Sequence, residues 1–119
     1  MKNIDLKELN KDIQKFVEER DWDQFHSIKN LACALSVESS ELLEIFQWLK
    51  DSESNEIHKN PALLSKVEDE VADIFVYLMR ILSKTEIDLE KAVRQKLLKN
   101  ELKYPVALSR GISKKYNEL

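Results

Sequence analysis

Apolar residues recur three and four positions apart in four stretches of the chain, separated by short polar connections. This spacing predicts amphipathic helices. Their expected ranges are about 5–19, 28–50, 61–83 and 88–104. Ser27 and Asp88 are predicted N-caps, and Asn60 is a predicted cap ahead of Pro61 at a first helical position. The last helix is expected to end before Pro105, because a residue before proline disfavours the helical region.

The remaining segments show no helical period. Residues 20–26 form a polar connection, and residues 51–59 are expected to be a loop or a short exposed turn. Residues 106–119 hold the only glycine, Gly111, and are expected to be a tail or an oligomer arm. We therefore expect one domain over residues 1–105 and a separate C-terminal segment over 106–119.

The composition supports an all-α fold. One glycine and two prolines in 119 residues supply too few turns for a sheet sandwich or barrel. A bundle of about four helices per chain is the expected architecture. The helix over 61–83 is apolar around much of its circumference, since Phe75, Val76 and Met79 extend the stripe of Val71 and Leu78. We expect this surface to join chains into a homo-oligomer, as a dimer or a dimer of dimers.

The charge balance excludes some partners. A net charge of −3, with 34% charged residues of both signs, creates no field that would attract nucleic acid or an acidic membrane. No apolar run approaches membrane-spanning length, and the first residues lack a signal-peptide pattern, so a cytoplasmic location is expected. Cys33 is the only cysteine, which excludes an intrachain disulfide and a cysteine-based zinc site. It is expected to be a small core residue.

Two predicted helices carry matching acidic stripes. Glu70, Asp73, Tyr77 and Arg80 follow at spacings of 3, 4 and 3 and therefore share one helix face. The preceding long helix repeats these spacings. Its stripe consists of Glu38, Glu41, Ile45 and Trp48.

Two acidic pairs on antiparallel helices can converge into a box of oxygen ligands. Mg²⁺, or Mn²⁺ in its place, is the type of cation that such a box holds. The competing interpretation is that these acids form ion pairs with lysine or arginine, or lie on a solvated face. Arg80 itself is expected in an ion pair or a subunit contact.

Other side chains have both a functional and an ordinary interpretation. Trp48 and Tyr77 could hold a planar group near the metal, although aromatic residues at helical spacing usually belong to the core. Lys96 and Asn100, one turn apart, could contact phosphate and a sugar or base edge, or could simply lie on the surface. His26 could be a ligand, but a single histidine in a loop more often makes an ordinary hydrogen bond.

The sequence resembles the MazG-like nucleoside triphosphate pyrophosphohydrolases, an all-alpha group that also contains the dimeric dUTPases. The signature is the pair Glu38 and Glu41 on one helix and the pair Glu70 and Asp73 on the next. Several further segments resemble the dCTP pyrophosphatase branch, over about residues 5–105. They are RDWDQFH (20–26), EIFQW (44–48), DIFVYL (73–78) and IDLEKAV (87–93).

The resemblance implies Mg²⁺-dependent hydrolysis of a deoxynucleoside triphosphate, with dCTP or related nucleotides favoured, to the monophosphate and pyrophosphate. The four acids of the signature would hold the metal. The resemblance also implies a nucleotide pocket shared between subunits. Its lining would be Trp22, His26, Asn30, Trp48, Tyr77, Lys96 and Asn100. Two alternatives stay open: a helical interaction module without catalysis, and a hydrolase of the dUTPase type.

Overall fold

The computed structural model describes residues 1–119 and is helical throughout, without strands. It consists of two compact units, Met1–Thr85 and Glu86–Leu119. The first unit contains α1 (Leu6–Glu19), the 3-10 helix η1 (Asp23–Phe25), α2 (Ile28–Phe46), α3 (Asp51–Asn55), the 3-10 helix η2 (Ile57–Lys59) and α4 (Pro61–Thr85). The second contains α5 (Leu89–Lys103), α6 (Val106–Ser109) and the 3-10 helix η3 (Tyr116–Glu118). The expected all-α fold with four long helices is confirmed.

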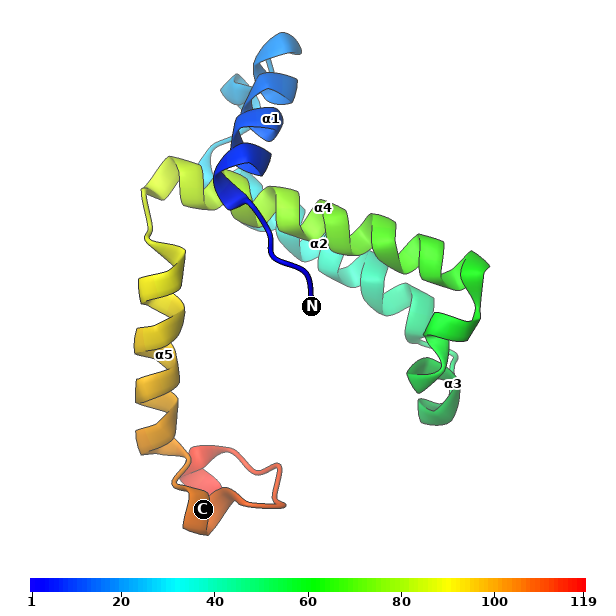
Figure 1. Ribbon diagram of the computed structural model, residues 1–119, viewed down its shortest axis with the longest axis vertical. Helices are drawn as coiled ribbons and strands as arrows, with labels where there is room; N and C mark the ends of the chain where they lie inside the picture. The colour runs from blue at the N-terminus through cyan, green and yellow to red at the C-terminus, as the bar shows by residue number, and fades with distance from the viewer. The chain divides into compact units, whose positions relative to one another are not determined.

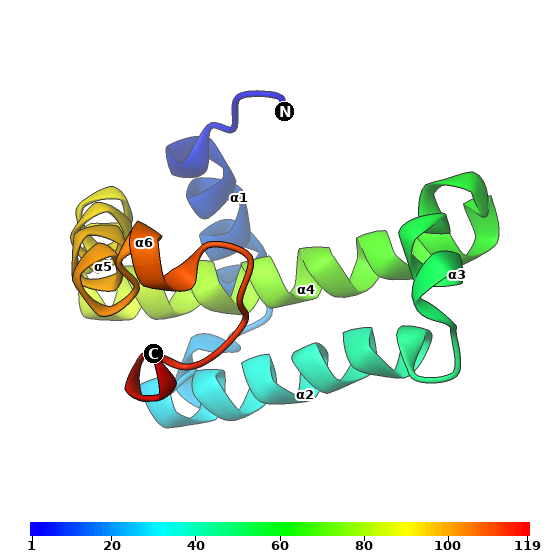
Figure 2. The same cartoon turned by 90° about the horizontal axis from the view of Figure 1, so that it is seen from below.

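Helices α2 and α4 form the framework of the first unit. They run side by side in opposite directions, joined through α3 and η2 at one end (Figures 1 and 2). Helix α1 also contacts α4. The buried apolar side chains come one from each of these three helices: Val17 from α1, Leu31 from α2 and Met79 from α4. A small core therefore holds α1 against the antiparallel pair.

Three helices begin directly after the capping residues that the sequence predicts. The side chains of Ser27 and Asp88 accept hydrogen bonds of 3.1 Å from backbone N–H groups in the first turns of α2 and α5. Asn60 Oδ1 accepts one of 3.2 Å from the Leu63 N–H at the start of α4. Each cap satisfies a donor that would otherwise lack a partner at the helix end.

Three segments differ from the sequence prediction. Helix α2 ends at Phe46 rather than near residue 50, so Trp48 lies in the following turn. Residues 51–59 form two short helices, α3 and η2. The Glu53 carboxylate accepts a 2.9 Å hydrogen bond from the Lys50 N–H and so supports the first turn of α3. The C-terminal segment 106–119 is also partly helical.

Within the second unit, the C-terminal segment folds back on the end of α5. The Tyr116 ring meets Tyr104 edge-on, with ring centroids 6.3 Å apart, and Lys103 Nζ lies 5.0 Å from the centre of the Tyr116 ring. Gly111 has a φ of +76°, which suits the turn between α6 and η3 because glycine has no Cβ to oppose that conformation. The predicted domain boundary near residue 105 stays a prediction.

Many apolar side chains of the first unit are exposed. They lie on α1, α2 and α4 and include Phe16, Val37, Leu43, Val71 and Leu78. The prediction that Cys33 is a core residue is wrong for the single chain, because its side chain on α2 is exposed. None of the helices combines the length and the apolar character that crossing a bilayer requires.

Candidate metal site

Three carboxylates meet where α2 and α4 lie side by side. Glu38 and Glu41 come from successive turns of α2, and Glu70 comes from the facing side of α4. Each offers an oxygen atom within 4.8 Å of the others. The antiparallel packing of the two helices thus brings together residues that are about thirty positions apart in sequence. This group could hold a metal ion.

The electrostatics of the three carboxylates are unfavourable without a cation. Burial and the neighbouring Glu41 and Glu70 raise the pKa of Glu38 to about 7. Burial, together with the charges of Glu41 and Asp73, also raises the pKa of Glu70. One oxygen of Glu38 and one of Glu70, Oε2 in each, are buried without a hydrogen-bond partner. No lysine or arginine pairs with the three carboxylates within 4.0 Å, so the ion-pair interpretation has no support here.

Asp73, the fourth predicted carboxylate, lies outside this group of three. It follows Glu70 by one turn of α4, on the same face, and its side chain is exposed. Its negative charge nevertheless contributes to the raised pKa of both Glu38 and Glu70. Asp73 is therefore close enough to repel the other acids.

A groove of about 570 Å³ borders the carboxylates. Its lining consists of Glu41, Glu44, Ile45, Leu63, Lys66, Asp69 and Glu70. The sequence interpretation gave Lys66 no role, although it precedes Glu70 by one helical turn and this spacing could have indicated it. Lys66 is the one cation in the groove lining and could contact an anion held there.

The three carboxylates lie in a part of the chain that resembles known proteins. The model of the MazG-like family matches residues 33–119. The chain belongs to the MazG-like family. It is 40% identical over 105 residues to dCTP pyrophosphatase 1 of Rattus norvegicus and 39% identical to that of Homo sapiens. In each case 88% of this chain aligns, and the chain spans 62% of the length of the relative.

A solved structure agrees with this assignment. A pyrophosphatase from Archaeoglobus fulgidus superposes with a TM-score of 0.76 at 37% sequence identity. The alignment covers 88% of the MazG-like chain and 96% of the archaeal one. Both the fold and the family that the sequence resemblance implies are therefore confirmed.

Two aromatic residues of the predicted pocket have different surroundings in this MazG-like chain. Burial raises the pKa of the Tyr77 phenol, and the charges of Glu38, Asp73 and Glu41 raise it further, which shows that Tyr77 lies close to the acids. Trp48 is 87% exposed in the turn after α2. The predicted stripe therefore continues along α4 as far as Arg80, but on α2 it stops before Trp48.

Four side chains form a second polar cluster at the start of α2. Arg80 is only 2% exposed, and its Nη2 donates a 2.7 Å hydrogen bond to Asp23 Oδ1, which also pairs with Lys84 Nζ at 2.7 Å. Arg80 Nε donates to His26 Nδ1 at 3.2 Å. The predicted ion pair of Arg80 is confirmed. Burial and the Arg80 charge lower the pKa of His26, and the Lys84 charge lowers it further, against the opposing effect of Asp23.

The remaining predicted pocket residues lie in both units. Trp22 packs edge-on against Phe16, with ring centroids 5.7 Å apart. The Asn30 amide donates a 3.0 Å hydrogen bond to the Phe25 carbonyl oxygen, so it closes the connection before α2. Lys96 and Asn100 lie one turn apart on α5, in the second unit.

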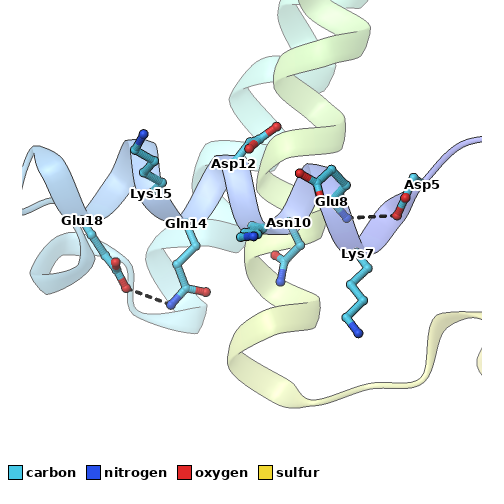
Figure 3. Close-up of a pocket in the computed structure, with 9 residues that line it drawn as sticks. Asp5, Lys7, Glu8, Asn10, Asp12, Gln14, Lys15 and Glu18 are labelled. Atoms are coloured by element: carbon cyan, nitrogen blue, oxygen red, sulfur yellow. Dashed lines mark hydrogen bonds between the residues drawn. The ribbon is translucent and has the colours of Figure 1, made fainter.

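A second hollow, of about 880 Å³, runs along α1 and is lined by polar residues of both charge signs. In Figure 3 its labelled side chains point to opposite sides of the helix rather than toward one another: Asp12 and Lys15 to one side, Lys7 and Gln14 to the other. The hydrogen bonds drawn there are local, such as that from Gln14 to Glu18. This hollow has no converging donor set.

Proposed function

We propose that this MazG-like protein hydrolyses nucleoside triphosphates, mainly deoxynucleotides, to the monophosphate and pyrophosphate, with dCTP or related nucleotides favoured. Such an activity removes surplus or noncanonical dNTPs. The observation that carries the proposal is the convergence of Glu38, Glu41 and Glu70, two of which have a buried oxygen without a partner. The similarity to proteins named dCTP pyrophosphatase 1 supports the substrate class.

The residues at the site suit Mg²⁺, with Mn²⁺ as a substitute. Carboxylate oxygens are the ligands that hard divalent cations prefer, and the buried Oε2 atoms of Glu38 and Glu70 need such a partner. We assign Glu38, Glu41 and Glu70 as ligands and Asp73 as the fourth acid of the site. When bound, the cation would supply charge neutralisation for the triphosphate and would make water a better nucleophile.

Side chains of the protein carry out the remaining steps. A carboxylate of the cluster accepts the proton of the water that attacks the α-phosphorus. The Tyr77 phenol is protonated at neutral pH, and burial and the neighbouring acids raise its pKa further, so its O–H can donate a hydrogen bond to the substrate. The other substrate-binding residues of the proposal are Trp22, His26, Asn30, Trp48, Lys96 and Asn100.

We further propose that the protein is a cytoplasmic homo-oligomer, a dimer or a dimer of dimers. The first unit has 85 residues and buries only three apolar side chains, while many large apolar side chains are exposed to water. A second copy covering the exposed Val71 and Leu78 of α4, the helix that the sequence predicts to join chains, or Val37 and Leu43 of α2, would remove that cost. A solution mass equal to one chain of 14.0 kDa at micromolar concentration would contradict this proposal.

The test of the activity is product analysis with each dNTP in the presence of Mg²⁺. Release of monophosphate and pyrophosphate, lost in EDTA, supports the proposal, whereas orthophosphate release contradicts it. Competition between dCTP and dUTP distinguishes the dUTPase-type alternative. A helical interaction module would show neither turnover nor Mg²⁺-dependent dNTP binding in calorimetry.

A further inference from the structure

Arg80 occupies an unusual position for a charged residue. It is 2% exposed, in a chain that buries few side chains so completely. A buried guanidinium is costly unless its N–H groups find partners, and here Nη2 donates to Asp23 and Nε donates to His26. Both partners belong to the connection between α1 and α2. Arg80 therefore ties this connection to α4.

The contact with His26 determines where the imidazole carries its proton. A guanidinium can only donate hydrogen bonds, so the Nδ1 atom that faces Arg80 Nε at 3.2 Å must be an acceptor. A neutral imidazole that accepts at Nδ1 carries its proton on Nε2. The Nε2–H group has no partner within the chain and is available to a ligand.

From this geometry we propose that Arg80 is a positioning residue, which holds His26 in the Nε2–H form and so makes it a fixed hydrogen-bond donor for the bound nucleotide. The substrate part of this inference rests on the proposed function. The positioning part rests on Arg80, Asp23 and His26 alone.

The distance between His26 and the carboxylates indicates whether His26 acts in substrate binding or in the chemical step. Its partner Arg80 follows Glu70 by ten residues on α4, about 15 Å along the helix axis. His26 therefore does not touch the phosphorus atom that the carboxylates would surround. A donor at this distance acts on substrate binding, so its loss should change KM more than kcat.

The other charged groups near His26 do not replace Arg80. Lys84 pairs with Asp23, and its side chain is 30% exposed, but it makes no hydrogen bond to the imidazole. Asp23 faces the same cluster and its charge favours a protonated His26, against the effect of the two cations. Burial lowers the pKa of His26 and thereby supports the neutral form that the Arg80 contact requires.

The tautomer can be measured directly by ¹⁵N NMR of the imidazole in a His58→Gln background, which leaves His26 as the only histidine. The parent should show one neutral form with the proton on Nε2. Arg80→Met, which removes both donors but keeps an unbranched side chain, should give a mixture of the two neutral tautomers. The matched control Lys84→Met, which removes only the second partner of Asp23, should keep the Nε2–H form. An unchanged tautomer in Arg80→Met overturns the inference.

Steady-state kinetics with dCTP and Mg²⁺ then test the substrate part. Arg80→Met should raise KM about two- to tenfold, the loss expected for one hydrogen bond, with kcat nearly unchanged. Arg80→Lys keeps the charge beside Asp23 but lacks the forked donors, so it should not restore KM. An unchanged KM in Arg80→Met contradicts the role toward the nucleotide. Absence of turnover in the parent contradicts the proposed function instead, while the NMR result still decides the positioning.

Discussion

The substitution Glu38→Gln tests the carboxylate cluster through stability rather than activity. The pKa of Glu38 is raised from 4.5 to about 7, mainly by burial and then by Glu41 and Glu70. In a fully shielded site this displacement would correspond to about 3.4 kcal/mol. Partial exposure and salt reduce the expected effect to about 1 to 2 kcal/mol.

The sign follows from the raised pKa in the folded state. Below pH 4.5 Glu38 is protonated in both the folded and the unfolded chain, and its contribution to stability is fully present. This contribution is lost as the pH rises through about 7, because the unfolded chain releases the proton more readily. In EDTA at pH 8, Glu38→Gln should therefore be more stable than the parent by about 1 to 2 kcal/mol, and the difference should disappear near pH 4.5.

Urea denaturation, monitored by circular dichroism, measures these differences in the free energy of unfolding. Added Mg²⁺ should stabilise the parent by about 1.4 kcal/mol at ten times the dissociation constant, and Glu38→Gln much less. Glu68→Gln on the exposed side of α4 is the matched control and should leave both effects unchanged. A Glu38→Gln protein that is less stable than the parent at pH 8 in EDTA, or that Mg²⁺ stabilises as much as the parent, would refute repulsion among these carboxylates and their binding of the metal.

Three further predictions concern activity, pH and the core. Glu41→Gln or Asp73→Asn should reduce turnover at least about a hundredfold with an unchanged circular dichroism spectrum, because each removes a charge but little volume; a rate near that of the parent would contradict the metal assignment. The pKa of His26, measured by NMR, should lie below 6.5, so its contribution to stability is present above pH 6.5 and is lost as the pH falls through its folded pKa; a value above 6.5 would disagree with the Arg80 contact. Leu31→Ala, at a side chain 1% exposed, should lower the free energy of unfolding by about 2 to 5 kcal/mol in urea denaturation; a loss under about 1 kcal/mol would show that Leu31 is not a core residue.

Much of the local structure could be predicted from the sequence, because its causes are local. The period of apolar residues determined the long helices, and Ser27, Asn60 and Asp88 marked their starts through hydrogen bonds within one turn. The end of α2 at Phe46 could not be predicted from the apolar period or from capping residues. The apolar period continues beyond that residue, whereas the chain must turn there to enter α3.

The carboxylate site was predictable in part. The matching spacing of acids on two helices indicated that Glu38, Glu41 and Glu70 could converge, and the antiparallel pairing of α2 and α4 brings them together. The same spacing placed Asp73 with them, but whether each acid reaches the group depends on how the two helices are rotated against each other. That rotation is set by packing, which helical periodicity alone does not contain.

The sequence by itself determined the all-helical class, the capping residues and the family signature, because propensity, period and short-range hydrogen bonds act within a few residues of each other. Only the tertiary structure showed that Arg80 is buried between Asp23 and His26, residues more than fifty positions away. It also showed that Cys33 is exposed in the single chain. Both depend on which helix faces are covered, and that is decided by contacts between segments far apart in the chain.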